Sequence, residues 1–78
     1  MSRLILVDAA TLEKLLFKLG FVKKRQKGSH VFYRHADGRV TTIPFHAGKD
    51  LPRPLLRDIL NEIKISIDEY NDLIRIVK

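Results

Sequence analysis

The sequence has no cysteine and no tryptophan, and its 78 residues include only three prolines and four glycines. Without cysteine, a disulfide-stabilised scaffold and a metal site built on thiolates are both excluded. The only apolar run near the N-terminus, Leu4 to Val7, is too short for a signal-peptide core or a membrane span. An apolar fraction of 45% is normal for a globular protein. We therefore expect one soluble, cytoplasmic domain over residues 1–78.

Acidic residues are also scarce, and they are unevenly placed. Nine Asp and Glu oppose fifteen Lys and Arg, which gives a net charge of +6. Residues 9–49 contain nine basic and two acidic residues, whereas residues 50–78 contain five basic and six acidic ones. A positive field concentrated in one half of a chain favours a polyanionic partner such as nucleic acid. A basic surface that serves only solubility is the alternative.

Helical periodicity is present at both ends of the chain. Four leucines recur at the spacing of one helix face, namely Leu12, Leu15, Leu16 and Leu19. With Asp8 as N-cap and Gly20 just past the end, this pattern predicts a helix over about residues 9–19. A second apolar stripe follows Pro52 and runs to about residue 64. Beyond it, Ser66 is a candidate N-cap for a short C-terminal helix.

Between the helices the pattern alternates, which predicts three strands at about residues 21–27, 30–35 and 40–43. Strict alternation puts Lys23, Arg25 and Lys27 on one face of the first strand. The same rule puts His30 and Phe32 on one face of the second strand. Turn residues between the strands predict an antiparallel meander. The predicted class is α+β, with the order α-β-β-β-α plus the short helix and with the helices on one face of a three-stranded sheet.

Three histidines are the side chains whose ordinary pKa lies near neutrality. His30 and His35 are separated by an odd number of residues, so a continuous strand directs them to opposite faces, and we expect no metal site and no cofactor. Ser29 and His30 are adjacent on a strand and point apart, which argues against a serine nucleophile. What remains is one histidine preceded by a run of cations. An imidazole among cations has the parts needed to cleave RNA, because the 2′-hydroxyl supplies the nucleophile.

An ordered set of short motifs runs through most of the chain. It comprises Gly20 and Phe21, Arg25 to His30, Tyr33 to His35, Asp37 to Arg39, Pro44 to Leu51, Leu56 to Leu60, and Ile65 with Ser66. The combination of Gly-Ser-His with a later His-Ala-Gly-Lys resembles the HicA (YcfA-like) toxins of bacterial and archaeal toxin–antitoxin systems. Leu4 to Asp8 is more apolar than the lead-in expected of that family, so the role of residues 1–8 is left open.

This resemblance implies a double-stranded-RNA-binding-domain-like fold, a metal-independent endoribonuclease that cleaves mRNA, and neutralisation by a HicB-type antitoxin. Its catalytic histidine corresponds to His30, acting as general acid or base. Candidate RNA-binding residues are Lys23, Arg25, Lys27, Ser29 and Lys49, and His46 is a candidate auxiliary group. A non-catalytic RNA-binding module is the alternative function. A protein-binding module is a third hypothesis, since the apolar face of the C-terminal helix could exceed what a small core covers.

Overall fold

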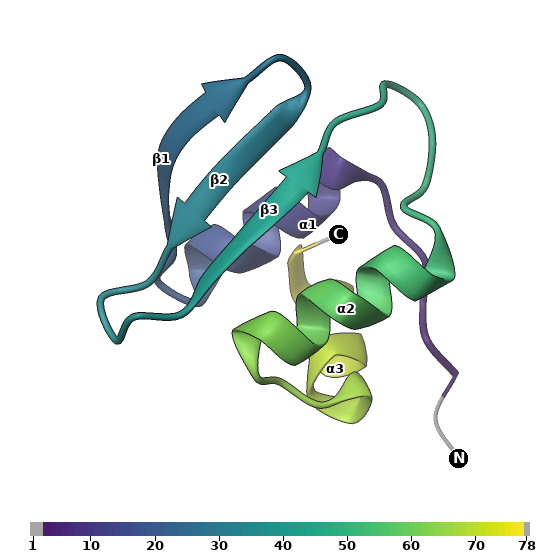
Figure 1. Cartoon of the computed structure of the whole chain (residues 1–78). Helices are drawn as coiled ribbons and strands as arrows, with labels where there is room; N and C mark the ends of the chain where they lie inside the picture. The colour runs from purple at the N-terminus through teal and green to yellow at the C-terminus, as the bar shows by residue number, and fades with distance from the viewer. Residues whose placement is uncertain (1–2, 78) are drawn as a thin grey trace.

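The computed structural model describes residues 3–77, which form helices and strands in the order α-β-β-β-α-α (Figure 1). The elements are α1 (Ala9–Lys18), β1 (Val22–Lys27), β2 (His30–Arg34), β3 (Val40–Pro44), α2 (Arg53–Ile63) and α3 (Ile67–Val77). The predicted α+β class and element order are confirmed, and most predicted boundaries agree to within one residue.

Local signals account for both ends of α1. The Asp8 carboxylate accepts a hydrogen bond from the Thr11 N–H at 2.9 Å, which caps the helix. Hydrogen bonding by the Thr11 side chain, and then by its backbone, holds the pKa of that carboxyl below its usual value. At the other end, Gly20 has a φ of +98°, a left-handed conformation that side chains rarely adopt. Local contacts therefore set the two ends of α1, while burial of its apolar face in the core stabilises the helix.

The strands form one antiparallel sheet in the order β1-β2-β3. Along β2 and β3 alternate side chains are buried against the helices, namely Val31, Tyr33, Thr41 and Ile43. The opposite side of the sheet, which we call the open face, carries His30, Phe32, Arg34, Val40 and Thr42. β1 pairs only with β2, so it is an edge strand, and all of its residues are exposed.

Two helices follow the sheet. α2 starts after Pro52, buries one apolar face and lies alongside β3 (Figure 1). It stops at Lys64, whose backbone is left-handed with a φ of 60°. Ser66 then caps α3 by accepting a hydrogen bond from the Glu69 N–H at 3.0 Å, as the sequence predicted.

The apolar face of α3 belongs to the core, so the prediction of a surplus apolar surface there was wrong. Tyr70 and Ile74 have no exposed surface, and Leu73 and Val77 pack half-buried against the same core. The Tyr70 hydroxyl donates to the backbone oxygen of Ile5 at 2.6 Å. With 11 residues, α3 is also as long as α2 rather than a short appendage.

The N-terminal segment supplies the packing partner that the sequence did not reveal. Leu4 and Val7 are buried in the core. The Asn71 side chain of α3 accepts from the Ile5 N–H at 3.3 Å and donates to the backbone oxygen of Arg3 at 2.7 Å. Residues 3–8 therefore lie against α3 as part of the fold, while residues 1 and 2 fall outside the described part of the chain.

Candidate active site

His30 is the first residue of β2, and its exposed side chain lies on the open face. It is paired with Lys27 of β1 and with Pro44 of β3, so both of these neighbours project on the same side of the sheet. The two-residue turn before it depends on Gly28, which has a φ of +60°. A tight turn thus presents the imidazole at one end of the sheet with a lysine directly beside it.

A β-bulge in β1 changes which cations share this face. Lys23 pairs with Tyr33 and Arg25 pairs with Phe32, so Lys24 is an extra residue between them. Arg25 and Lys27 share one face of β1, as predicted, and this is the open face that also carries His30. Lys23 stands with Tyr33 on the helix side, so the prediction that it shares their face was wrong. The prediction assumed that side chains alternate strictly between the two faces of the strand, and this assumption does not hold where a bulge inserts an extra residue.

The same bulge brings in a cation that the sequence did not single out. Lys24 lines a hollow with Val22 and Arg34, a pair that belongs to the open face. Nearer to His30, the Arg25 guanidinium lies over the Phe32 ring, 4.8 Å from its centroid. One face of this ring is therefore already occupied by a cation that is itself directed along the open face.

The remaining candidates lie near the turn before His30. The backbone oxygen of Ser29, which is half-buried, accepts from the Phe45 N–H at 2.7 Å. His46 follows directly and is exposed, and its backbone oxygen accepts from the Lys49 N–H at 3.2 Å. The structure therefore ties the loop that carries His46 and Lys49 to the turn that carries His30.

His35 has a structural position at the other end of the hairpin. Its Nε2 is 3.0 Å from the backbone oxygen of Leu19, and its Nδ1 is 3.1 Å from the Asp37 N–H. Nδ1 also lies 3.0 Å from Asp37 Oδ1, so Asp37 contacts this nitrogen with both its backbone and its side chain. With both nitrogens engaged, His35 joins the end of α1 to the hairpin and is separate from His30.

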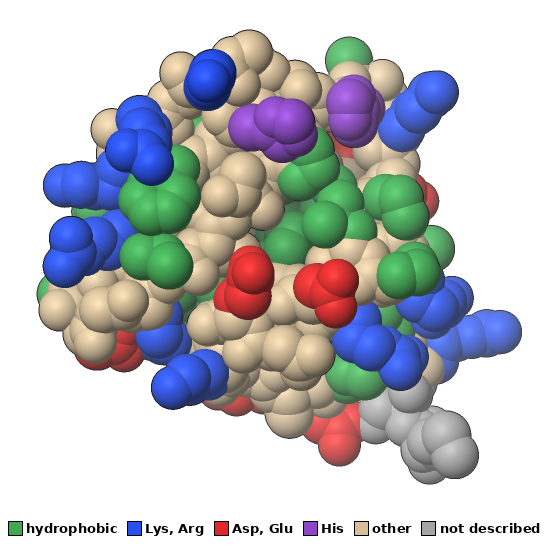
Figure 2. Space-filling view, in the orientation of Figure 1, with side chains coloured by type: hydrophobic (Ala, Val, Ile, Leu, Met, Phe, Trp, Pro, Cys, Tyr) green, Lys and Arg blue, Asp and Glu red, His purple; other side chains and the backbone are tan. Residues whose placement is uncertain are grey.

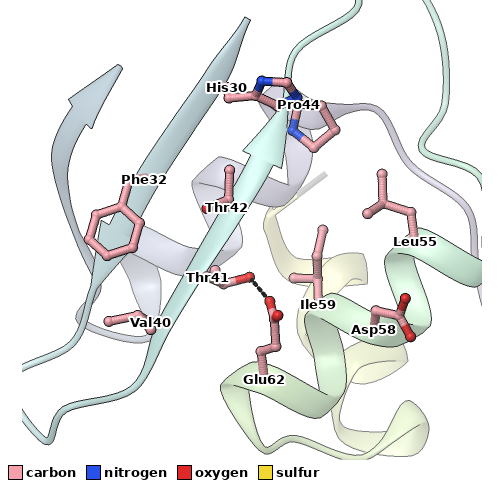
Figure 3. A pocket seen from close by; sticks show the side chains of 10 residues that line it. All are labelled: His30, Phe32, Val40, Thr41, Thr42, Pro44, Leu55, Asp58, Ile59 and Glu62. Carbon is pink, nitrogen blue, oxygen red and sulfur yellow. Dashed lines mark hydrogen bonds between the residues drawn. The ribbon is translucent and has the colours of Figure 1, made fainter. Parts of the chain in front are cut away.

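A groove opens beside His30, between the open face and α2, with a volume of about 370 Å³ (Figure 3). Its walls are mainly apolar, and two carboxylates, Asp58 and Glu62, stand along its α2 side. The Thr41 hydroxyl donates to Glu62 Oε1 at 2.6 Å. Sequence reasoning missed this groove, since the only available signal was the one-turn spacing of the two acids on a predicted helix.

The two sides of His30 therefore differ in charge. Figure 2 shows Lys and Arg side chains gathered over β1 and β2, at the left of the view, and two acidic side chains near its centre below an apolar hollow. Within residues 3–77, no group of three or more His, Asp or Glu side chains is arranged to hold a metal ion. The cationic side suits phosphate groups, whereas the acidic side repels them.

A cationic sheet face next to an exposed histidine is the main feature of this small basic protein, and such a positive surface attracts anionic groups. A family model described as HicA toxin of bacterial toxin-antitoxin matches residues 9–65, most of the chain. The chain therefore belongs to the HicA toxin family, and it is the toxin component of a toxin–antitoxin system. A comparison with curated proteins gave no match.

Membership of this family implies an antitoxin partner. A search of residues 3–77 for a helix both long and apolar enough to span a bilayer found none.

Proposed function

We propose that the protein is a metal-independent endoribonuclease that cleaves mRNA in the cytoplasm with His30 as general acid or base. The observation that carries this proposal is the exposed imidazole beside Lys27 and Arg25 on the open face of a HicA-family toxin. An exposed ring is accessible to a ribose-phosphate linkage, and the two cations lie where its phosphate charge needs stabilisation.

The chemistry requires two proton transfers. The 2′-oxygen forms a bond to the neighbouring phosphorus while the bond from phosphorus to the 5′-oxygen breaks, which leaves a 2′,3′-cyclic phosphate and a 5′-hydroxyl. One proton leaves the 2′-hydroxyl and one is delivered to the 5′-oxygen, so the step is balanced without a metal. His30 transfers one of these protons, and His46, in the adjoining loop, is the candidate for the other.

Charge stabilisation falls to the cations around His30. Arg25 and Lys27 share its face of the sheet, and Lys24 and Arg34 extend the positive surface along the strands. Ser29 lies in the turn before His30, and Lys49 lies in the loop that begins at Phe45, whose N–H is hydrogen-bonded to Ser29. We expect phosphates of the RNA to lie over these side chains, whereas Lys23 faces away.

The decisive experiment compares wild type with His30→Ala on a purified mRNA in the presence of EDTA. Loss of general acid–base catalysis typically costs about 100- to 10,000-fold, so cleavage by the variant should fall at least about 100-fold. Because His30 is exposed, the thermal midpoint of the His30→Ala variant should match that of wild type. His46→Ala should cost less than His30→Ala if His46 is auxiliary.

Each contrary result has a definite meaning. Equal cleavage by wild type and His30→Ala would remove His30 from the mechanism. A wild-type enzyme that stops cleaving in EDTA would refute metal independence. Wild type that binds RNA without cutting it would instead support the non-catalytic RNA-binding alternative.

The antitoxin partner, proposed to be of HicB type, is expected to cover the open face and screen His30 from RNA. This surface carries Arg25 and Lys27 beside His30, so an acidic partner segment fits it. RNA cleavage measured before and after forming the complex tests this expectation. A complex that retains full cleavage would contradict it.

A further inference from the structure

The groove beside His30 has features that a phosphate-binding surface does not need. It is lined on one side by His30, Phe32 and Thr42 of the open face, and on the other by α2 (Figure 3). Leu55 and Ile59 supply apolar surface on the α2 side. Its volume of about 370 Å³ lies within the range of small-molecule sites. A flat, apolar group of modest size therefore fits between these walls.

The two carboxylates restrict the chemistry of that group. Ionised Asp58 and Glu62 are hydrogen-bond acceptors only, so their partner must present N–H or O–H donors. Glu62 is held in place because its Oε1 accepts from Thr41, whose side chain is buried. Its second oxygen is left for another donor, and Asp58 is exposed one turn earlier on the same helix.

A nucleobase with an exocyclic amino group meets both requirements. Its ring matches the apolar walls, and the amino group of adenine, cytosine or guanine is a donor, as in carboxylate contacts to cytosine N4. Uracil has no such group; its one ring donor, N3–H, lies between two carbonyl oxygens, so a carboxylate that approaches this donor also meets oxygens that repel it. Phosphate is also repelled, so the acids direct a base rather than the backbone into the groove.

We infer that this groove is a base-selecting subsite that accepts an amino-bearing base, and rejects uracil, at one position next to the scissile phosphate. The inference rests on the proposed ribonuclease activity. His30 and Phe32 line the groove and also belong to the cationic open face, so a strand with its phosphates over the cations can place one base between β3 and α2.

The test maps cut sites of wild type on a long mRNA of mixed sequence, by sequencing the new ends. At one fixed position near the cut, the frequency of uridine should be at least about tenfold lower than its frequency in the whole transcript. A factor of this size is expected from one hydrogen bond to a charged acceptor. In a short RNA containing a preferred site, that base is then replaced by its analogue without the amino group, and cleavage should slow by a similar factor.

The variant is Asp58→Asn with Glu62→Gln, in which the new amide oxygen at position 62 would keep an acceptor for Thr41. Its discrimination against uridine should disappear. The matched control, Glu69→Gln with Asp72→Asn on α3, removes the same two charges outside the groove and should keep full discrimination. This control separates base selection from a general gain in RNA affinity.

The outcomes separate the two hypotheses. Absence of all cleavage refutes the proposed activity and the subsite with it. Cleavage with uridine at its expected frequency at every flanking position leaves the activity standing and overturns the subsite; the groove would then suit a cationic side chain of a protein partner. Loss of discrimination in the control pair as well as in the groove pair would also overturn it.

Discussion

The bulge in β1 leads to opposite predictions for two adjacent lysines. Lys24→Ala removes a cation from the open face, whereas Lys23→Ala removes one from the helix side of the sheet. Both side chains are exposed, so each change should alter the free energy of unfolding by less than about 0.5 kcal/mol. Each variant also loses one positive charge, so any difference in RNA affinity reflects position alone.

The expected magnitude follows from one ion pair in water. Two unit charges 4 Å apart interact by about 1 kcal/mol at the dielectric of water, which corresponds to about a fivefold change in Kd. Lys24→Ala should weaken RNA binding by about this factor and reduce the salt dependence of log K by about 0.7, the contribution of one contact to a single strand. Lys23→Ala should change Kd by less than about twofold, because its side chain emerges on the opposite face.

The assay is fluorescence anisotropy with a labelled single-stranded RNA at salt concentrations between about 50 and 200 mM. Both substitutions are made in a His30→Ala background, so that the RNA stays intact during the titration. Equal losses for the two lysines, or a larger loss for Lys23→Ala, would refute the assignment of the RNA-binding face. Binding without any salt dependence would refute phosphate contact altogether.

Two further predictions concern stability. In urea denaturation, Gly20→Ala should lower the free energy of unfolding by more than Gly38→Ala does. Both glycines have φ near +100°, so both substitutions strain the backbone. Only a Cβ at Gly20 would also meet His35 Nε2, at 3.1 Å. Similar losses would mean that the His35 contact adds nothing. Asp8→Ala should cost about 1 kcal/mol at neutral pH through loss of the cap. The pKa of Asp8 is lower in the folded state than in the unfolded state, so this stabilisation is complete above the unfolded pKa of about 3.9 and is lost as the pH falls through the folded value. The thermal midpoints of wild type and Asp8→Ala should therefore converge in acid. A difference that stays constant with pH would contradict this.

Several features were predictable because their signals are local. The cap at Asp8 and the left-handed Gly20 bound α1, and Ser66 starts α3, all through contacts within a few residues along the chain. Alternation correctly assigned the two faces of β2, because that strand has no insertion. The position of His30 at the start of β2 follows from the glycine turn before it.

Other features were beyond sequence patterns because they depend on distant partners. The bulge at Lys24 is defined by the register of β1 against β2, and so Lys23 was assigned to the wrong face. The burial of Tyr70 depends on residues 3–8, which are more than sixty positions away. Nothing in the spacing of the residues indicates which remote segment covers an apolar helix face.

The difference between the features that the sequence predicted and those that it did not predict has one physical cause, the range of the interactions involved. By itself the sequence determined where helices and turns begin and end, where positive charge is concentrated, and that one histidine follows a glycine turn, since short-range hydrogen bonds and backbone preferences act within a few residues. Only the tertiary structure decided which cations join His30 on the open face and that Glu62 and Asp58 stand across a groove from it. Those neighbours come from separate elements. The pairing of β1 with β2 places the cations beside His30, and the packing of α2 against β3 places the two carboxylates across the groove.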